Sequence, residues 1–403
     1  MRVLLVDKLA STIVERLEAA GCAVTEEIGI KGEALTARLA AINPQVVVVR
    51  STKLAKEQLL AAPDLSLVIR AGAGVDTIDV KLASERGIYV ANCPGKNAIA
   101  VAELTLGLLI SLDRRIPDNV IALRAHAWKK SEFSKARGLY GRTLAVLGTG
   151  DIGKAVISRA QAFGMVVRAW SRSLSREAAE AMGVTWCATP REACKGADAL
   201  TIHVASNAST KGLVSRELLE ALRPGAFVLN TSRGDVVDEA ALRELMATRG
   251  LRAGLDVFQN EPAKDGAFDS AILDEAGLYG THHIGASTDQ ASDAVADEVV
   301  RIIEGYVQSG NVLNVVNLES APPATHLLVV RHADRVGVLA SVLGTLREAG
   351  VSVQEMENII FKGAAAASAR IQLDRAPAPE HLEQIRAHAD IFSATLVALE
   401  SAR

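Results

Sequence analysis

The stretch LAVLGTGDIG, residues 144–153, decides the fold of the chain. It opens with a short apolar run typical of a buried strand, and an amphipathic segment follows it to about Phe163. In a GxGxxG turn the first glycine allows the tight bend, the second lets the backbone approach a pyrophosphate at a helix N-terminus, and the third allows close helix–strand packing. The stretch therefore predicts a dinucleotide-binding turn made by Gly148, Gly150, Asp151, Ile152 and Gly153.

Further apolar segments surround this turn and alternate with amphipathic ones. Downstream they read VVRAW, ALTIHV, AFVLNTS, RAGLDVF and LYGTHH; upstream they read RVLLV, VVVVR, LVIR and IYVAN. The first helical pattern between them runs from about Ser11 to Ala20. Short β-branched runs that alternate with helices are typical of βαβ units and parallel sheets. We therefore predict an α/β chain with two doubly wound, Rossmann-like domains, the first flavodoxin-like.

Residues 98–112 form a long segment that is apolar on nearly every face and follows Asn97 at a helix cap position. A helix without a polar face is buried on all sides. The pattern predicts a helix held between domains or between subunits. We therefore expect a homodimer or homotetramer.

The C-terminal part begins after NVVNLESAPPAT, residues 314–325, whose adjacent prolines and small residues indicate a linker. From His326 the pattern is strand, helix over about 336–349, strand, strand, helix over about 380–388, and strand. This order is the βαββαβ ferredoxin-like unit. It predicts a third, separate domain.

Composition excludes several classes of protein. With 49% hydrophobic and 23% charged residues the chain is not disordered, and a net charge of −3 gives no general reason to bind nucleic acid or anionic membrane. The N-terminal apolar run is broken by Asp7 and is too short for a signal peptide. The four cysteines of the chain lack the paired CxxC spacing of a zinc site. We expect a cytoplasmic protein without a metal site.

The second cofactor signal lies in VVRAWSRS, residues 166–173. About 20 residues after the glycine-rich turn, a carboxylate commonly binds the ribose hydroxyls of NAD. Ser171 occupies that position here and Arg172 follows it, so a 2′-hydroxyl loses its usual partner and a 2′-phosphate gains a cation. In the alternative, Arg172 is solvated and water holds the ribose. We expect NAD as the cofactor, with NADP also accepted.

Three residues that follow later strands have the chemistry for hydride transfer to a 2-oxo acid. They are Arg233 in LNTSRGDVVDE, Glu261 in GLDVFQNEP and His283 in GTHHIGAST. The reaction needs a cation that holds the carboxylate and polarises the carbonyl, a proton donor, and a carboxylate that orients the donor. Each residue alone is more often structural, but together they match that task.

These segments also match a known family. With VVVVRSTK, IRAGAGVDTIDV, VAELTLG, DRRIP and HAWKKSEF, they occur in the order found in D-isomer-specific 2-hydroxyacid dehydrogenases. The chain resembles that family over nearly its whole length, and within it the phosphoglycerate dehydrogenases. The resemblance implies that Arg233 binds substrate, that His283 is the general acid and base, and that Glu261 pairs with it. It also implies a cofactor site lined by Thr231, Ser232, Asp256, Gly285 and Ala286.

The resemblance further implies a domain organisation in three parts. Residues 1–95 and 284–318 form a discontinuous substrate-binding domain, residues 96–283 the NAD(P)-binding domain, and residues 325–403 an ACT regulatory domain. The substrate would be a phosphorylated hydroxy acid. Its carboxylate would bind the backbone of Gly72, Ala73, Gly74 and Val75, which is otherwise a plain tight turn.

The phosphate contacts implied by the resemblance are Arg50, Ser51 and Lys130. Lys130 and its neighbour Lys129 are otherwise a solvated surface pair. An ACT domain implies an amino-acid effector. Where the serine-binding form has asparagine, this chain has Asp334 and Ser352, and Val336 replaces proline. An aspartate does not donate as an amide does, so the pattern leaves inhibition by serine open.

Two other functions fit parts of the sequence. A glyoxylate or hydroxypyruvate reductase is favoured by the segment WSRS and disfavoured by the ACT-like domain. A dinucleotide-sensing corepressor would reuse the fold without catalysis, but it would not require Arg233, Glu261 and His283 together.

Overall fold

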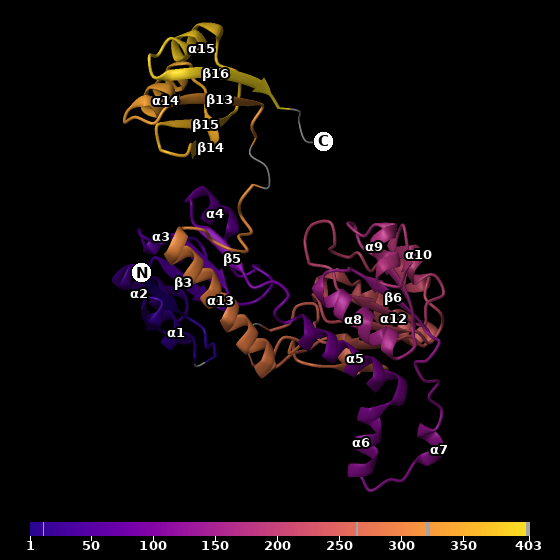
Figure 1. Cartoon of the computed structure of the whole chain (residues 1–403). Coiled ribbons are helices and arrows are strands. Elements are labelled where there is room, and N and C mark those ends of the chain that lie inside the picture. Colours follow the sequence, from indigo (N-terminus) through magenta and orange to yellow (C-terminus); the bar gives the residue numbers. More distant parts are fainter. Residues whose placement is uncertain (11, 263–264, 320–322, 400–403) are drawn as a thin grey trace. The chain divides into compact units, whose positions relative to one another are not determined.

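The structure is a computed structural model that describes residues 1–10, 12–262, 265–319 and 323–399 (Figure 1). It divides into two compact units, residues 1–317 and 318–403, and each is described by itself. The predicted helix start at Ser11 lies outside the described residues. Among the described residues, no helix is long and apolar enough to cross a membrane.

The first sheet of the larger unit has five parallel strands in the order β2-β1-β3-β4-β5, a flavodoxin-like order. The strands are β1 (Arg2–Leu5), β2 (Ala23–Glu26), β3 (Val46–Val49), β4 (Leu67–Arg70) and β5 (Tyr89–Asn92). Their helices are α1 (Ile13–Ala19), α2 (Gly32–Ile42), α3 (Lys56–Ala61), α4 (Val80–Glu85) and, much later in sequence, α13 (Asp289–Ser309). Val299 and Ile302 of α13 are buried against Leu5 of this sheet, so the chain returns to its first sheet after residue 283.

The second sheet has seven parallel strands in the order β12-β11-β10-β9-β6-β7-β8. They are β6 (Thr143–Leu147), β7 (Val166–Trp170), β8 (Thr185–Trp186), β9 (Ala199–Ile202), β10 (Phe227–Asn230), β11 (Arg252–Leu255) and β12 (Leu278–Gly280). All the predicted strands are present. Neither β2 nor β8 was among the predicted strands, and β8 is a two-residue edge strand with no periodicity to read.

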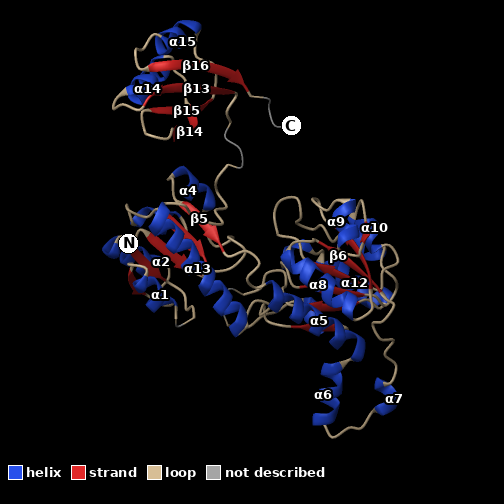
Figure 2. Cartoon of the chain, viewed as in Figure 1, coloured by secondary structure: helices blue, strands red, loops and turns tan. Residues whose placement is uncertain are grey.

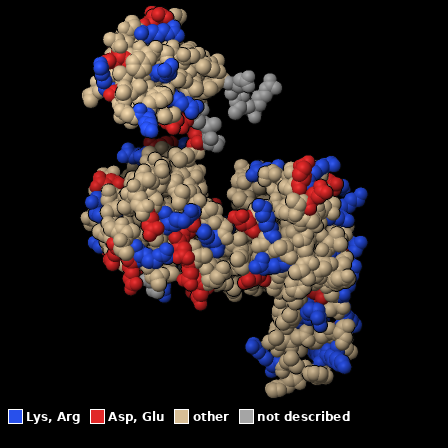
Figure 3. All heavy atoms as spheres, viewed as in Figure 1, with Lys and Arg blue, Asp and Glu red and all other residues tan. Residues whose placement is uncertain are grey.

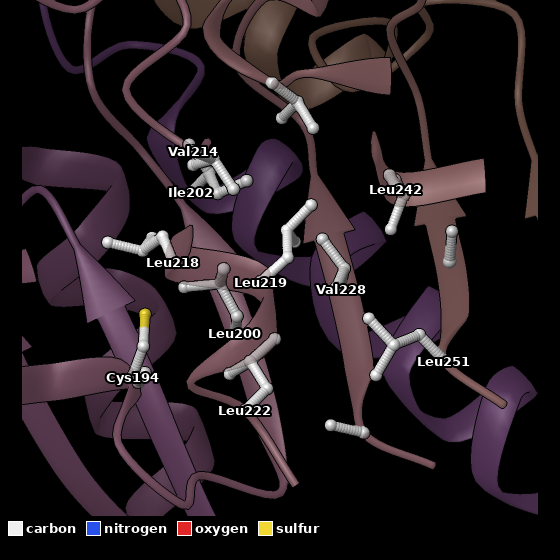
Figure 4. Packing of buried hydrophobic residues seen from close by; sticks show 14 of the residues in the cluster. Cys194, Leu200, Ile202, Val214, Leu218, Leu219, Leu222, Val228, Leu242 and Leu251 are labelled. Carbon is white, nitrogen blue, oxygen red and sulfur yellow. The ribbon is translucent and has the colours of Figure 1, made fainter. Parts of the chain in front are cut away.

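Helices cover both faces of this second sheet (Figure 2). They are α5 (Ala98–Arg114), α8 (Asp151–Ala162), α9 (Arg176–Ala181), α10 (Pro190–Cys194), α11 (Arg216–Glu220) and α12 (Glu239–Arg249). Figure 4 shows one face, where Leu200 and Val228 of the sheet meet Leu219 and Leu242 of the helices. These aliphatic side chains are fully buried, which accounts for the continuous apolar runs in the sequence.

The helix predicted from residues 98–112 is α5, and its side chains are mostly buried, as predicted. It packs against α8 and against β10, β11 and β12. Two short helices, α6 (Ile116–Arg124) and α7 (Lys130–Phe133), follow it. None of the residues of α6 is buried, although Ile121 and Leu123 are apolar.

The smaller unit contains β13 (His326–Ala333), α14 (Val338–Glu348), β14 (Val353–Ile360), β15 (Ala366–Leu373), α15 (Pro379–Arg386) and β16 (Ile391–Ala398). The predicted βαββαβ order is confirmed. The strands form an antiparallel sheet in the order β14-β15-β13-β16. Leu328 and Ile371 of the sheet pack with Val342 and Ile385 of the helices in a separate core.

The predicted linker begins later than its composition indicated. Asn314 and Asn317 form hydrogen bonds with the backbone of β5, and Ala91 pairs with Val315 in an antiparallel bridge. Residues 314–317 therefore belong to the first sheet. Composition did not reveal this, because side-chain amides that bind a strand edge look like loop residues in a sequence.

A buried ion cluster joins α13 to the segment that precedes α5. Glu298 has a side chain only 3% exposed, and its carboxylate lies 3.0 Å from Nζ of Lys96, 2.5 Å from Nη2 of Arg301 and 2.7 Å from Nδ2 of Asn314. Burial alone would raise the pKa of Glu298, but these three donors lower it from 4.5 to about 2.

We expect the Glu298→Gln variant to be less stable than the wild type by about 3 kcal/mol at pH 7. Because the folded pKa is depressed, this stability is present above the usual value of 4.5 and is lost as the pH falls towards 2. Denaturant unfolding across that window should show the difference shrinking. Glu304→Gln, in the same helix, is the control and should change little. If the difference in the free energy of unfolding between the wild type and Glu298→Gln did not depend on pH, the depressed pKa of Glu298 would be contradicted.

Candidate active site

Glu261 and His283 form a pair beyond the carboxyl ends of β11 and β12. Oε1 of Glu261 lies 2.5 Å from Nδ1 of His283, and Oε2 accepts a hydrogen bond of 3.3 Å from the amide of Phe258. Because the carboxylate engages Nδ1, Nε2 is the ring nitrogen that can exchange a proton with a substrate. The structure thus brings together two of the three predicted catalytic residues.

The electrostatics of Glu261 favour its charged form. Partial burial alone would raise the pKa of this carboxyl, but the hydrogen bond and charge of His283, with the amide of Phe258 and the charge of Arg233, lower it below its usual value. An anion beside an imidazole stabilises the imidazolium. The pair is therefore arranged to hold a proton that a general acid can deliver.

Asp256 fixes the loop that carries His283. Its side chain is buried, and its carboxylate accepts hydrogen bonds from Thr281 Oγ1 at 2.6 Å, Ile284 N at 2.8 Å and Gly285 N at 2.8 Å. A Cβ on Gly285 would lie 2.9 Å from Oδ2 of Asp256, so the close approach requires glycine. The role of Asp256 in lining the cofactor site stays a prediction. Its observed contacts give it a positioning role.

Arg233 follows β10 and meets the predicted substrate loop. Its Nη2 donates to Asp76 Oδ2 at 3.1 Å, and a Cβ on Gly74 would lie 2.8 Å from the same nitrogen. Nη1 donates to the carbonyl of Ser232 at 2.7 Å. The guanidinium is therefore held against the loop of residues 72–75, as the prediction requires.

Arg70, the last residue of β4, is a candidate that the sequence analysis missed. Its Nε donates to the carbonyl of Arg50 at 3.1 Å, and a Cβ on Gly72 would overlap its guanidinium. Burial lowers the pKa of Arg70, and the charges of Arg233 and Arg50 lower it further, while Asp76 raises it. Three arginines therefore lie close enough to repel one another. The available signal was a cation directly before AGAG, at the carboxyl end of a parallel strand.

Ser51 has a different partner from the one expected. Its hydroxyl and amide both donate to the carboxylate of Asp7, at 3.2 and 2.9 Å, and the amides of Arg50 and Thr52 donate to Asp7 as well. Burial alone would raise the pKa of Asp7, but these amides lower it. Both donors of Ser51 thus contact Asp7 and shape the turn after β3, and the expected phosphate contact of Ser51 stays a prediction.

The two remaining predicted phosphate contacts lie in different surroundings. Arg50 extends towards Ser292 of α13, with 3.4 Å between Nη1 and Oγ. Lys130 opens α7 and lines a surface pocket with Asn119 and Leu123 of α6. Within one chain the structure thus groups Arg50 with Arg70 and Arg233 but associates Lys130 with α6.

The glycine-rich turn has the geometry that its spacing predicts. Gly148 has a φ of +97°, and a Cβ there would lie 2.5 Å from the carbonyl oxygen of His203. A Cβ on Gly153 would lie 2.0 Å from the carbonyl oxygen of Gly148. Gly150 caps α8 and has open space around its Cβ position, so a phosphate could approach its backbone. The side chain of Asp151 instead lies beside Gly95.

The remaining predicted cofactor residues lie after β10 and β12, and their contact with a dinucleotide stays a prediction. Nδ1 of His203 is buried without a hydrogen-bond partner among the described residues, and burial lowers the pKa of His203 to about 3, so the ring is neutral. Thr231 Oγ1 lies 2.9 Å from Thr105 Oγ1, and Ser232 donates to Asn230 Oδ1. Gly285 and Ala286 follow His283 on the same loop.

Arg172 is anchored and does not simply point into solvent. Its Nη1 donates to Ser209 Oγ at 3.1 Å, which connects the end of β7 to the loop after β9. Ser171 precedes it at the position of the expected acid. Arg172 is itself exposed, and its contact with a ribose 2′-substituent stays a prediction. Among the residues that the structure describes, no group of three or more His, Cys, Asp or Glu side chains could hold a metal ion.

Comparisons with known proteins agree with this geometry. Residues 106–285 match the model of the D-isomer-specific 2-hydroxyacid dehydrogenase NAD-binding domain. The chain is 37% identical over 328 residues to the D-3-phosphoglycerate dehydrogenase of Methanocaldococcus jannaschii, covering 80% of this chain and 60% of that protein. It is 32% identical over 363 residues to the same enzyme of Archaeoglobus fulgidus, covering 87% and 67%.

A solved structure matches the larger part of the chain. It is an NADPH-dependent glyoxylate/hydroxypyruvate reductase of Sinorhizobium meliloti, with a TM-score of 0.68 and 30% identity, covering 78% of this chain and 97% of that one. This chain spans only 60% to 67% of the length of the two curated relatives.

Proposed function

We propose, from the premise that this chain belongs to the family of D-isomer-specific 2-hydroxyacid dehydrogenases, that it oxidises 3-phosphoglycerate to 3-phosphohydroxypyruvate with NAD, the first step of serine biosynthesis. The pairing of Glu261 with His283 carries the oxidoreductase part of the proposal. The grouping of Arg50 and Arg70 with Arg233 supports the phosphorylated substrate. A cytoplasmic location follows from that pathway.

The reaction distributes its steps among these residues. Arg233 binds the substrate carboxylate and polarises the oxygen on C2. His283 removes the hydroxyl proton at Nε2 while the C2 hydride leaves, and returns the proton in the reverse direction. Glu261 stabilises the imidazolium. When bound at the glycine-rich turn, the dinucleotide supplies the nicotinamide ring that takes the hydride.

The phosphate would be recognised by guanidinium groups. Arginine binds phosphoryl oxygens through two parallel hydrogen bonds, and two such groups neutralise a dianion. Arg50 and Arg70 lie beside the loop that receives the carboxylate, which supports a substrate with an anion at each end. Lys130 would join them only from a second copy of the chain.

The exposed apolar side chains of α6 support a homodimer or homotetramer.

Arg70→Gln tests this phosphate contact. We expect kcat/KM for phosphohydroxypyruvate to fall at least ~10-fold more than kcat/KM for hydroxypyruvate, because a charge-assisted hydrogen bond is lost only with the phosphorylated substrate. Arg86→Gln, an exposed arginine at the end of α4, is the control. Equal losses with both substrates would reject Arg70 as a phosphate contact.

Glu261→Gln tests the pairing with His283. Removing the anion that contacts Nδ1 of His283 should change the pH dependence of kcat/KM as well as the rate. Steady-state rates across the pH range measure this. Glu275→Gln, near β12 but paired with Arg243, is the control. An unshifted profile would mean that the pair is not functional.

The C-terminal βαββαβ unit is proposed to be an ACT domain that binds an amino-acid effector. Asp334 and Ser352 depart from the asparagines of the serine-binding form, so effectors other than serine belong in the assay. Arg335 between them is tied to Asp390, which orders the turn after β13.

A chain that ends after Glu319 is expected to keep substantial dehydrogenase activity, because the larger unit has its own cores and contains all the catalytic residues. The boundary predicted near Ser320 lies outside the described residues. Activity assays and circular dichroism of the shortened chain measure this. Complete unfolding would show that the two units depend on each other.

A glyoxylate or hydroxypyruvate reductase is the second candidate. The contact of Arg172 with Ser209, which suits NADP, favours it. Reduction of glyoxylate as efficient as that of phosphohydroxypyruvate would support this alternative. A corepressor without catalysis would not require the Glu261–His283 pair.

A further inference from the structure

A strongly cationic pocket lies at the edge of the second sheet opposite the catalytic residues. It has a volume of about 370 Å³ and is bounded by the end of α5, by α7 and the residues after it, and by the residues that begin β6, β10 and β11. Seven arginine or lysine residues line it against three acidic ones, an excess of four positive charges. Figure 3 shows basic side chains gathered over the part of the chain that carries α6 and α7.

The acidic residues of this pocket are already engaged with protein donors. Asp198 accepts hydrogen bonds from Arg137 at 2.7 Å, Arg223 at 3.1 Å and the amide of Thr143 at 2.9 Å. Asp113 accepts from Arg142 at 3.0 Å and from the amide of Gly138 at 3.1 Å. The third acidic residue, Glu132, accepts a hydrogen bond of 3.2 Å from Arg115. These contacts hold the arginines in place, and the lining of the pocket keeps an excess of four positive charges.

Arg142 reveals how crowded these charges are. Its side chain is only 6% exposed, and its Nε has no hydrogen-bond partner among the described residues. Its guanidinium lies 4.5 Å from the centre of the Phe227 ring. Burial lowers the pKa of Arg142, the two aspartates raise it, and Arg137 and Arg223 lower it again. Two aspartates and the ring of Phe227 thus hold this buried cation among like charges.

We propose that this pocket binds a compact polyanion that carries two or more phosphoryl groups. Six of the seven cations are arginines, whose planar guanidinium groups bind phosphoryl oxygens in pairs and stack on aromatic rings. Such a stack is present, because Arg115 lies 4.7 Å from the centre of the Phe133 ring. The volume lies within the ~300–1,000 Å³ of small-molecule sites.

The site is separate from the catalytic machinery but connected to it by one helix. The pocket includes Asp113 near the end of α5, whereas Thr105 of the same helix contacts Thr231 beside Arg233. A ligand that binds at the end of α5 would therefore contact the same helix that contacts the loop after β10. The inference does not depend on the proposed substrate, since binding can be measured without turnover.

The test is isothermal titration of the full chain with inorganic tripolyphosphate and with ATP, in saturating NAD and constant ionic strength. Saturating NAD keeps these ligands out of the glycine-rich turn. We expect the double variant R114Q/K135Q, which removes two exposed cations of the pocket, to weaken binding at least ~10-fold. Ligands recognised only by their phosphoryl chain would bind equally well, and tighter binding of ATP would indicate a nucleoside contact.

Three further variants make the result decisive. R347Q/K362Q removes two exposed cations from the smaller unit and should bind like the wild type, as should Arg50→Gln in the proposed substrate site. Circular dichroism checks that each variant is folded, and Lys135→Gln alone replaces the double variant if that one is not. Absence of binding to the wild type, or equal losses in R347Q/K362Q and R114Q/K135Q, would overturn the proposal. Loss of binding in Arg50→Gln alone would assign the polyanion to the substrate site.

Discussion

Replacing His283 with asparagine is expected to lower kcat by at least ~10²-fold, with little change in the affinity for the dinucleotide. Asparagine keeps a polar group at the position but cannot take up a proton. The hydroxyl proton of the substrate then has no acceptor in the step that releases the hydride. Steady-state rates in both directions, with cofactor affinity from fluorescence titration, measure the effect.

The neighbouring His282 provides a matched control. It is exposed, as is His283, but it has no part in the pair with Glu261. His282→Asn should therefore turn over at nearly the wild-type rate. Near-normal turnover of His283→Asn, or an equal loss in both variants, would reject His283 as the general acid and base.

The second large effect concerns the choice between NAD and NADP. Ser171→Asp restores a carboxylate that binds ribose hydroxyls and repels a 2′-phosphate, and should raise the NAD:NADP ratio of kcat/KM. Arg172→Ala removes the cation that Ser209 holds in place and should depress NADP use specifically. Each contact is worth roughly 1–3 kcal/mol, so each substitution should change the NAD:NADP ratio by ~5–150-fold.

Relaxed use of both dinucleotides is therefore expected of the wild type, with NAD as the physiological partner. Ser173→Asp, an exposed neighbouring serine, controls for the added charge and should shift the ratio less. If the wild type already excludes NADP by more than ~10³-fold, roughly 4 kcal/mol, another residue enforces the choice. The interpretation of residues 166–173 would then be wrong.

Patterns of local sequence predicted most of the fold. Strands buried on both faces give continuous apolar runs, and the glycine-rich turn lies between one such run and a helix, so βαβ order could be read directly. The pairing of Glu261 with His283 was implied by the family resemblance, and it agrees with the rule that residues following neighbouring parallel strands meet at one edge of the sheet.

Long-range contacts account for what the sequence did not reveal. The contacts of Ser51 with Asp7, 44 residues away in sequence, were not predicted. Arg70 was read as the end of a strand, and only the folded loop brings it against Gly72. Residues 314–317 resemble a linker, yet their amides complete the edge of β5. In each case the partner is set by packing, which a local pattern does not encode.

The central claim is that this chain recognises a phosphorylated acid. The most direct measurement is the ratio of kcat/KM for phosphohydroxypyruvate to kcat/KM for hydroxypyruvate with the wild-type chain. These substrates differ only in the phosphoryl group, so the ratio isolates its contacts with Arg50 and Arg70. We predict a ratio of at least ~100, about 2.7 kcal/mol, as expected for two charge-assisted contacts. A ratio near one would contradict the claim.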